Sequence, residues 1–586
     1  MRRRHIIVIF VILLAFCFGM LLGHLNRKSM TEDRKFEQYT DELFKAQIMT
    51  NTINLHYTLA DPSQYGIRRY PITLGHMDAV SLAGDTELLQ EQSDRLNQFD
   101  YDSLSKENQM TYDILKLSLE TDRLLGSNYL MQEPLSPTLG IQAQLPILLA
   151  EYAFRNKDDI EDYLELLTLT ESYFQEIIEY EKVKSRSGLF MSSKTAGRIV
   201  EQCRSFIQNA DANYLLSTFE DRIRECSFLS EKQTEKYIRE NEEAVRQHLI
   251  PAYENLIQAL EQLKNTGKNP YGLCHYAGGQ SYYEYLVKSS TGVYDDISTI
   301  EQRLQQQLVS DFTRMRRLLK VHTEISDELE PNLFREKNLE SPESILTDLQ
   351  EKMAYDFPAL KEIDYSVKYV HSDLEAYLSP AFYLTPPFDA LSPNSIYLNS
   401  QSDFSDITRY TTLAHEGFPG HLYQTQYFAQ SSPDSIRYLL TTGGYVEGWA
   451  TYVESYAYQY APLPRDIGEI LWLNRSINLC LYSLTDLGIH YRGWTPDDTA
   501  HFLKIFGITD PDAVAEIYQC ILEDPANYLQ YYVGCLSFLD LRKALQERLG
   551  ADFELLEFHR KLLEIGPAPF PILKKYLFDF YDKIPS

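Results

Sequence analysis

Hydrophobic residues recur at helical spacing along most of this chain. The clearest case is a stripe with separations of three or four residues, which places its members on one face of a helix. The stripe consists of Ile297, Ile300, Leu304, Leu308, Phe312, Met315 and Leu319. A second helix is predicted to begin at Ser230, which can form a capping box with Gln233, to kink at Pro251 and to stop at Gly267. No internal repeat or glycine–serine linker interrupts this pattern, so the sequence favours a mainly α-helical globular fold.

Two short stretches near the middle of the chain depart from helical spacing. Residues 365–369 alternate large and polar side chains, and residues 395–400 (SIYLNS) have strand propensity, so each is predicted to be a β-strand. Residues 379–395 are rich in proline and are predicted to form a loop. A small β-element is therefore expected just before the most informative motif of the chain.

The first 28 residues differ from the rest. Residues 6–25 are apolar over about the length that a helix needs to cross roughly 30 Å of hydrocarbon, and three arginines precede them. The positive charges favour a cytoplasmic N-terminus, with the chain from about residue 29 outside. We therefore expect a single-pass membrane anchor; the alternative is a cleaved signal peptide and a secreted protein. Cys17 is not expected to be a lipoprotein site, because bulky Phe16 precedes it.

Composition narrows the classes of function. Hydrophobic residues make up 44% and charged residues 24% of the chain, which excludes a disordered protein. Lys and Arg number 55 against 84 Asp and Glu, and the net charge of −29 would repel a nucleic acid backbone. The cysteines beyond Cys17 permit disulfides in an oxidising compartment, but their pairing cannot be assigned. The sequence also lacks the motifs of α/β serine hydrolases, P-loop enzymes and Rossmann dehydrogenases.

The segment TTLAHEGFPGHLYQ carries the first candidate chemistry. His415, Glu416 and His421 resemble the HExxH motif, in which two histidines bind zinc and the glutamate is the general base. These histidines are six positions apart, however, and on a regular helix they would point about 240° apart. Pro419 and Gly420 lie between them and favour a break or bulge in the helix. Such a break is predicted to bring both imidazoles to one point.

A second acidic segment, GGYVEGWATYVE, follows this motif. Glu447 lies 26 residues after His421 and completes a set of two histidines and one glutamate, which leaves a fourth zinc position for water. Glu454 shares a helix face with Glu447 and is predicted to orient a ligand histidine without binding the metal itself. The alternative without a metal is a helix terminus with buried polar residues and ordinary ion pairs.

At these residues the chain resembles a known family. HEGFPGH followed by VEGWATYVE resembles the bacterial family catalogued as domain of unknown function 885, which is similar to the gluzincin metallopeptidases. The resemblance is close from about residue 270 to the C-terminus and looser over the N-terminal helices. Its further segments are GGQSYYEYLV, SIYLN, DLGIHYRGWT, PANYLQYYVG and FHRKLLEIGPAPF.

The resemblance implies one zinc ion held by His415, His421 and Glu447. It also implies that Glu416 activates the attacking water, because a carboxylate beside the metal can accept a proton and pass it to the leaving amine.

Other residues of the family segments are candidates for contacts with the substrate. A tetrahedral oxyanion needs a hydrogen-bond donor, for which His490 and Tyr531 are the candidates, with Tyr532 as the alternative to Tyr531. The SIYLN strand is expected to present a free edge to an extended peptide. His559 is expected to be structural.

The implied fold is mainly α: a large two-lobed helical bundle around a cleft, with a small β-element next to the metal helix and an N-terminal transmembrane helix. Residues 1–28 are predicted to be the membrane anchor or signal peptide, 29–290 a helical lobe and 291–586 the metal-binding catalytic lobe. The predicted function is a zinc metallopeptidase acting on short or unfolded peptides outside the cytoplasmic membrane. The alternatives are a non-catalytic surface protein that binds peptides or proteins, and a zinc hydrolase of another amide or ester.

Overall fold

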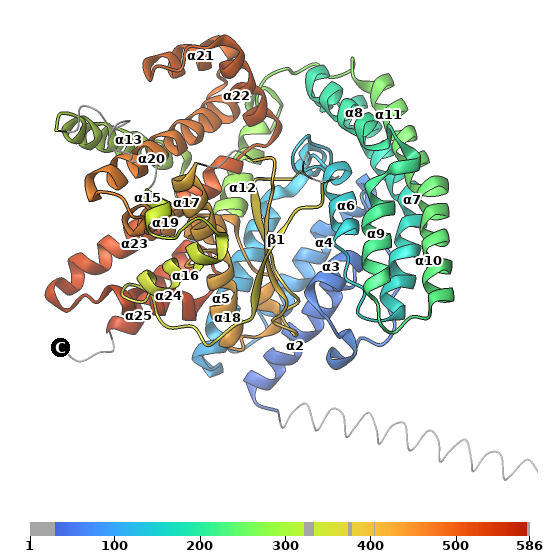
Figure 1. Cartoon of the computed structure of the whole chain (residues 1–586), viewed down its shortest axis with the longest axis horizontal. Helices are drawn as coiled ribbons and strands as arrows, with labels where there is room; N and C mark the ends of the chain where they lie inside the picture. The colour runs from blue at the N-terminus through green and yellow to red at the C-terminus, as the bar shows by residue number, and fades with distance from the viewer. Residues whose placement is uncertain (1–29, 322–332, 373–374, 376–377, 403–404, 583–586) are drawn as a thin grey trace, which may run out of the picture.

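A computed structural model describes residues 30–321, 333–372, 375, 378–402 and 405–582. The fold is mainly α-helical, as predicted, and helices lie on both sides of one small sheet (Figure 1). The predicted membrane helix at residues 6–25 lies outside the described residues. Among the helices that are described, none is long and apolar enough to cross a membrane.

One large hydrophobic core lies among six helices of the N-terminal half, which form the cyan and green side of the molecule in Figure 1. These helices are α6 (Ile141–Ala150), α7 (Lys157–Arg186), α8 (Ser193–Ile207), α9 (Tyr214–Glu225), α10 (Glu231–Ala244) and α11 (Ile250–Leu263). The longest of them, α7, begins with a capping box between Asn156 and Asp159. Its buried face packs against α11, where Tyr253 is fully buried and donates a hydrogen bond to the Gln142 carbonyl.

Four helices at the N-terminus pack between this core and the second one. They are α2 (Glu32–Ile48), α3 (Thr52–Thr58), α4 (Ala79–Leu96) and α5 (Lys106–Asp122). Two smaller hydrophobic clusters hold them together. Helix α5 also contacts helices of the C-terminal half, to which Ile114 contributes a buried side chain.

The helices of the C-terminal half form the rest of the fold, and most of them pack around the second large core. These helices are α12 (Gly279–Thr291), α13 (Ile297–Leu319), α15 (Leu333–Glu336), α16 (Pro342–Met353), α17 (Asp406–Glu416), α18 (His421–Gln430), α19 (Gly443–Tyr460), α20 (Arg465–Leu487), α21 (Pro496–Ile505), α22 (Pro511–Glu523), α23 (Asn527–Leu549), α24 (Leu555–Ile565) and α25 (Phe570–Asp582). The helices of the chain thus surround two main hydrophobic cores. The side chains of Tyr283 and Val287 place α12 in the second core.

The helices predicted from the sequence are present. Gln233 accepts a hydrogen bond from the Ser230 N–H at 3.1 Å, which completes the predicted capping box at the start of α10. Near Pro251 the helix passes through one π-helical turn, Val245–Leu249, and continues as α11. Helix α13 covers the predicted apolar stripe, of which Ile297, Ile300, Leu304 and Leu308 are buried.

The sheet has three strands and corrects two predictions. Strands β1 (Tyr365–Tyr369) and β3 (Asn394–Leu398) are parallel, as the two predicted strand segments allow. Strand β2 (Ala381–Leu384) forms within the segment predicted to be a loop and pairs antiparallel with β3. Because the strand order is β1–β3–β2, the SIYLN strand is central and fully buried, and it has no free edge. The edge strand next to α17 is β2.

The six cysteines among the described residues are free thiols. The disulfides that the composition permitted are therefore absent from this part of the chain.

Helices α19 and α23 touch through their backbones. A Cβ atom added to Gly448 would lie 2.5 Å from the carbonyl carbon of Gly534. One added to Gly534 would lie 2.3 Å from the carbonyl oxygen of Gly444. Since real Cβ atoms do not approach so closely, only glycine allows this crossing.

We expect Gly448→Ala to destabilise the protein by about 1–3 kcal/mol, because the extra methyl group forces the two helices apart. Gly197→Ala in α8 is the matched control, since its added Cβ would meet nothing within 4 Å. That control is expected to stabilise the helix by up to about 1 kcal/mol. Thermal denaturation of both variants checks the prediction. Equal Tm values for the two variants would contradict the close helix contact.

Candidate metal centre

The helix that carries the first histidine breaks directly after it. Helix α17 ends at Glu416, and α18 begins at His421. Gly417 and Gly420 have non-helical backbone angles, and a Cβ on Gly420 would lie 1.8 Å from the His415 carbonyl oxygen. The predicted break at HEGFPGH is confirmed.

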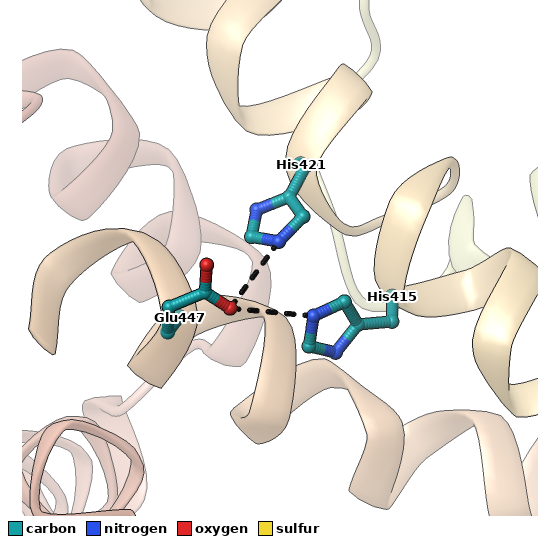
Figure 2. A group of neighbouring side chains, drawn as sticks. All are labelled: His415, His421 and Glu447. Carbon is teal, nitrogen blue, oxygen red and sulfur yellow. Dashed lines mark ion pairs between the residues drawn. The ribbon is translucent and has the colours of Figure 1, made fainter. Parts of the chain in front are cut away.

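The break lets both histidines face the same carboxylate, which comes from α19. The Nε2 atoms of His415 and His421 each lie 3.5 Å from Glu447 Oε2 (Figure 2). The two imidazole planes are 89° apart, with ring centroids separated by 4.7 Å. One ligand atom from each of the three residues lies within 4.8 Å of the others, so the structure brings the three predicted ligands together.

This donor set fits zinc. Donors about 2.0–2.1 Å from a tetrahedral zinc ion are about 3.4 Å apart, which matches the nitrogen–oxygen separations of 3.5 Å. The other ring nitrogen of His421, Nδ1, is buried without a hydrogen-bond partner among the described residues, so its ring has no competing structural role there. Two histidines with one glutamate are typical of a catalytic zinc site with an open fourth position.

A second group of possible ligands, His76, Asp78 and Glu176, lies nearer the surface. Its carboxylates already have structural roles. Asp78 caps α4 through the N–H groups of Val80 and Ser81, and Glu176 accepts a hydrogen bond from the Met77 N–H. These contacts favour the buried His415 group as the metal centre.

Glu454 orients His415 from outside the ligand group. His415 Nδ1 donates a hydrogen bond to Glu454 Oε1 at 2.8 Å, which points Nε2 at Glu447. Arg475 of α20 donates two hydrogen bonds to the same carboxylate, from Nε to Oε2 at 2.9 Å and from Nη2 to Oε1 at 3.2 Å. Burial opposes ionisation of Glu454, but the charges of Arg475 and His415 outweigh it and lower the pKa of Glu454 to about 2. This is the contact predicted for Glu454.

The carboxylates around the ligand group favour a positive charge among them. Burial acts to lower the pKa of His415, but hydrogen bonds to Glu447 and Glu454 outweigh it and raise this pKa to about 10. Burial acts to raise the pKa of Glu447, but His415 and His421 hold it well below its usual value. A bound divalent cation would satisfy the same carboxylates without a proton on His415.

Glu416 faces the ligand group from the end of α17. Its Oε2 atom accepts a hydrogen bond of 2.9 Å from the Tyr383 N–H, so strand β2 fixes the carboxylate through its main chain. Burial raises the pKa of Glu416, and the nearby Glu447 carboxylate raises it further, against the effect of the two histidines. A buried carboxylate of raised pKa is suited to accept a proton.

Of the two candidate tyrosines, Tyr531 lies near the carboxylates. Burial raises the pKa of Tyr531, and the charges of Glu447 and Glu416 raise it further. Tyr532 is buried away from them, and its hydroxyl shares a hydrogen bond with the Ser476 hydroxyl. The charges that act on each phenol therefore favour Tyr531 over Tyr532 as the one nearer the candidate metal centre.

The two remaining histidines of the family segments are structural. His490 Nε2 donates to the Ile521 carbonyl at 2.9 Å, and Nδ1 accepts from the Leu273 N–H at 3.3 Å. Burial lowers the pKa of His490 to about 4, so the ring is neutral and has no free N–H for the oxyanion role predicted for it. His559 is fully buried and its Nδ1 donates to the Asp356 carbonyl, as expected for a structural histidine.

Three contributions to the site were not predicted. Arg475 pairs with Glu454, the main chain of Tyr383 holds Glu416, and Trp449 Nε1 donates to the Pro419 carbonyl at 2.9 Å. Trp449 belongs to the segment EGWATYVE. A buried indole usually needs a hydrogen-bond acceptor, so its presence in this segment was a signal for such a contact. No spacing rule in the sequence connects Arg475 or Tyr383 to the motif.

Comparisons with known proteins agree with this architecture. The sequence profile of the family described as "Bacterial protein of unknown function (DUF885)" matches residues 63–577. No curated protein matches the chain.

Two solved structures share the fold. One, provisionally described as a lipoprotein from Colwellia psychrerythraea, has a TM-score of 0.83 at 19% identity and covers 94% of this chain and 100% of its own. Another, provisionally described as a lipoprotein of unknown function from Shewanella oneidensis, has a TM-score of 0.65 at 15% identity over 93% and 99% of the two chains.

We expect Glu454→Gln to weaken zinc binding about 10- to 100-fold, because the neutral amide orients and polarises His415 less strongly. Competition with a chromogenic chelator measures the affinity. The control is Glu469→Gln. Glu469 lies on α20, as Arg475 does, but forms a more exposed ion pair with Arg314 of α13. This variant should bind zinc as the unaltered chain does. Unchanged affinity in Glu454→Gln would show that Glu454 does not support the ligand.

Proposed function

The chain belongs to the bacterial DUF885 family, and from that premise we propose that it is a zinc-dependent metallopeptidase. The observation that carries the proposal is the convergence of His415, His421 and Glu447 beside a separately held carboxylate, Glu416. The first three residues would hold the zinc, and the fourth would serve as the base.

Glu416 favours an enzyme over a binding protein. A protein that only binds peptides needs no buried carboxylate beside its metal ligands, because such a group costs free energy to bury. Here one oxygen of Glu416 is fixed by the Tyr383 N–H, and the other makes no hydrogen bond to the described residues. That second oxygen remains available to accept a proton.

In peptide hydrolysis each of these groups would have a separate role. Bound zinc supplies a Lewis acid that polarises a carbonyl and lowers the pKa of water. Glu416 accepts the proton from the attacking water and passes it to the amide nitrogen that leaves. The phenol of Tyr531 donates a hydrogen bond to the oxyanion that develops on the substrate carbonyl.

Strand β2 takes over the role predicted for the SIYLN strand. In an antiparallel pair the N–H and C=O of one residue point to the same side, and the Tyr383 N–H points at Glu416 and away from β3. An extended peptide that pairs with this outer edge of β2 runs past the general base. Main-chain pairing of this kind accepts many sequences, which suits short or unfolded peptides.

We place the activity outside the cytoplasmic membrane. The positively charged and apolar residues 1–28 support export, with residues 6–25 as an anchor or a cleaved signal. Two proteins of the same fold are provisionally described as lipoproteins, which supports an extracytoplasmic location for this chain as well.

Glu416→Gln separates the base from the ligands. We expect the purified variant to retain one zinc per chain and to lose peptide hydrolysis by about 100-fold or more. Glu447→Ala should lose both the zinc and the activity, whereas His501→Ala, at an exposed position of α21, should lose neither. Elemental analysis and cleavage of a mixed peptide library measure these outcomes. A wild-type protein with bound zinc that cleaves no peptide or other amide would favour the binding protein.

Tyr531→Phe tests the oxyanion donor. Loss of this hydrogen bond is expected to lower kcat about 100- to 1000-fold with little change in KM, because the contact forms in the transition state. Tyr532→Phe is the control. It removes a buried hydrogen bond to Ser476, so it should lower Tm and leave kcat nearly unchanged. Steady-state kinetics and thermal denaturation distinguish the two effects. If the Tyr532 variant alone lost kcat, the assignment would be reversed.

A further inference from the structure

A pocket lies where the two halves of the chain meet. It has a volume of about 340 Å³, and its walls come from residues 131–195 on one side and from α12 and the connection between α22 and α23 on the other. Its position between the halves is typical of ligand sites in two-lobed enzymes.

The charged groups in this pocket are acidic. Glu133, Glu523 and Asp524 line it, and no lysine or arginine from the described part of the chain does. Lys184 pairs with Glu133, and Arg198 lies 3.5 Å from Glu523.

Asp524 has no such cationic partner. Its Oδ1 accepts a hydrogen bond from the Ser136 hydroxyl, and no described lysine, arginine or histidine forms an ion pair with it. Burial raises its pKa, and the hydroxyl groups of Ser136 and Thr138 and the charge of Arg198 offset this effect only in part. A ligand cation in the pocket would supply a direct counter-charge.

The backbone around Asp524 is held rigidly. Ala526, at the start of α23, has a φ of +65°, and its N–H donates to both carboxylate oxygens of Asp486 at 3.1 and 3.0 Å. Asp486 is itself fully buried. The position of Asp524 is therefore set before any ligand enters.

Aromatic and apolar side chains form much of the rest of the pocket, together with uncharged polar groups such as Ser192, Asn269 and Gln530. Tyr271, Tyr276 and Tyr282 line it together with methionine and leucine side chains. Aromatic faces attract cations, and apolar walls accept the methylene groups of long basic side chains. Acidic, aromatic and apolar groups together match the chemistry of arginine and lysine.

One wall of the pocket lies against the start of α19, the helix that carries Glu447. Gln530 forms part of its wall, and its Oε1 would lie 1.9 Å from a Cβ added to Gly443. Gly443 and Glu447 are four residues apart in α19, on the same helix face and about 6 Å apart along the axis. Tyr531, the proposed oxyanion donor, directly follows Gln530.

We propose that this pocket is a specificity subsite that binds an arginine or lysine side chain of the peptide substrate, with Asp524 as its counter-charge. The inference rests on the proposed peptidase function and adds the substrate class. When a basic side chain of the substrate is held there, a peptide bond a few residues away in the substrate would lie at the metal centre.

The test uses pairs of peptides that are acetylated at the N-terminus and amidated at the C-terminus. Within each pair one position carries either arginine or norleucine, and the position is moved along the peptide. For one position, wild-type holoenzyme should cleave the arginine peptide with a kcat/KM about 10- to 100-fold higher than its partner. In Asp524→Asn this ratio should fall toward one, mainly through KM.

A second variant covers the case in which Asp524→Asn does not fold. Leu139 lines the pocket and is 57% exposed, so Leu139→Lys places a competing cation at the rim without disturbing a core. It should also lower the arginine preference. Leu124→Lys, at a 47% exposed position that does not line the pocket, should leave the preference unchanged.

A binding measurement separates this inference from the proposed function. Calorimetry with the zinc-loaded Glu416→Gln protein should show tighter binding of the arginine peptide than of the norleucine peptide, and Asp524→Asn in that background should remove the difference. Cleavage and binding without any charge preference would overturn the subsite and leave the peptidase standing. Preferential binding of arginine without cleavage by wild type would retain the subsite and overturn the peptidase.

Discussion

The balance of buried charge governs the candidate metal centre. Glu416, Glu447 and Glu454 surround two imidazoles, and the guanidinium of Arg475 pairs with one of these carboxylates. Buried carboxylates without compensation would oppose folding. When no metal is bound, the raised pKa of His415 favours a proton on its ring, which supplies part of the missing positive charge. A divalent cation together with Arg475 would neutralise three carboxylates completely, so the same residues that destabilise the empty site favour the occupied one.

Two uses of glycine make this arrangement possible. Gly420 allows the chain to turn back against the carbonyl of His415, and Gly448 lets α19 lie directly on α23. The first brings the histidines together, and the second places the helix of Glu447 beside the helix of Tyr531. The hydrogen bond from Trp449 to Pro419 joins the two, because it fixes the broken segment to α19.

The meeting of the candidate ligand residues could be predicted because local chemistry marks them. His415, Glu416 and His421 have the residue types of a zinc motif. Their spacing requires a break in the helix, and Pro419 and Gly420, which lie before His421, predict that break. The long helices could be predicted for a similar reason, since their apolar periodicity is contained within each segment.

Features that arise from long-range packing could not be predicted in this way. Strand β2 is four residues long and lies in a proline-rich segment, and only its pairing with β3 makes it a strand. Arg475 reaches Glu454 from another helix without any motif. His490 has the residue type of a catalytic group, but the sequence does not show that both its nitrogens bind the main chain.

The hydrogen bond from Tyr383 to Glu416 has a consequence for how such a protein can diversify. The main chain, and not a side chain, holds Glu416, the proposed general base, at the edge of β2. Replacement of the side chain at position 383 therefore leaves the donor in place, provided that the new residue is not proline. Side chains along this strand are therefore free to vary during evolution while Glu416 keeps its position, and under the proposed function such changes would alter which peptides are accepted.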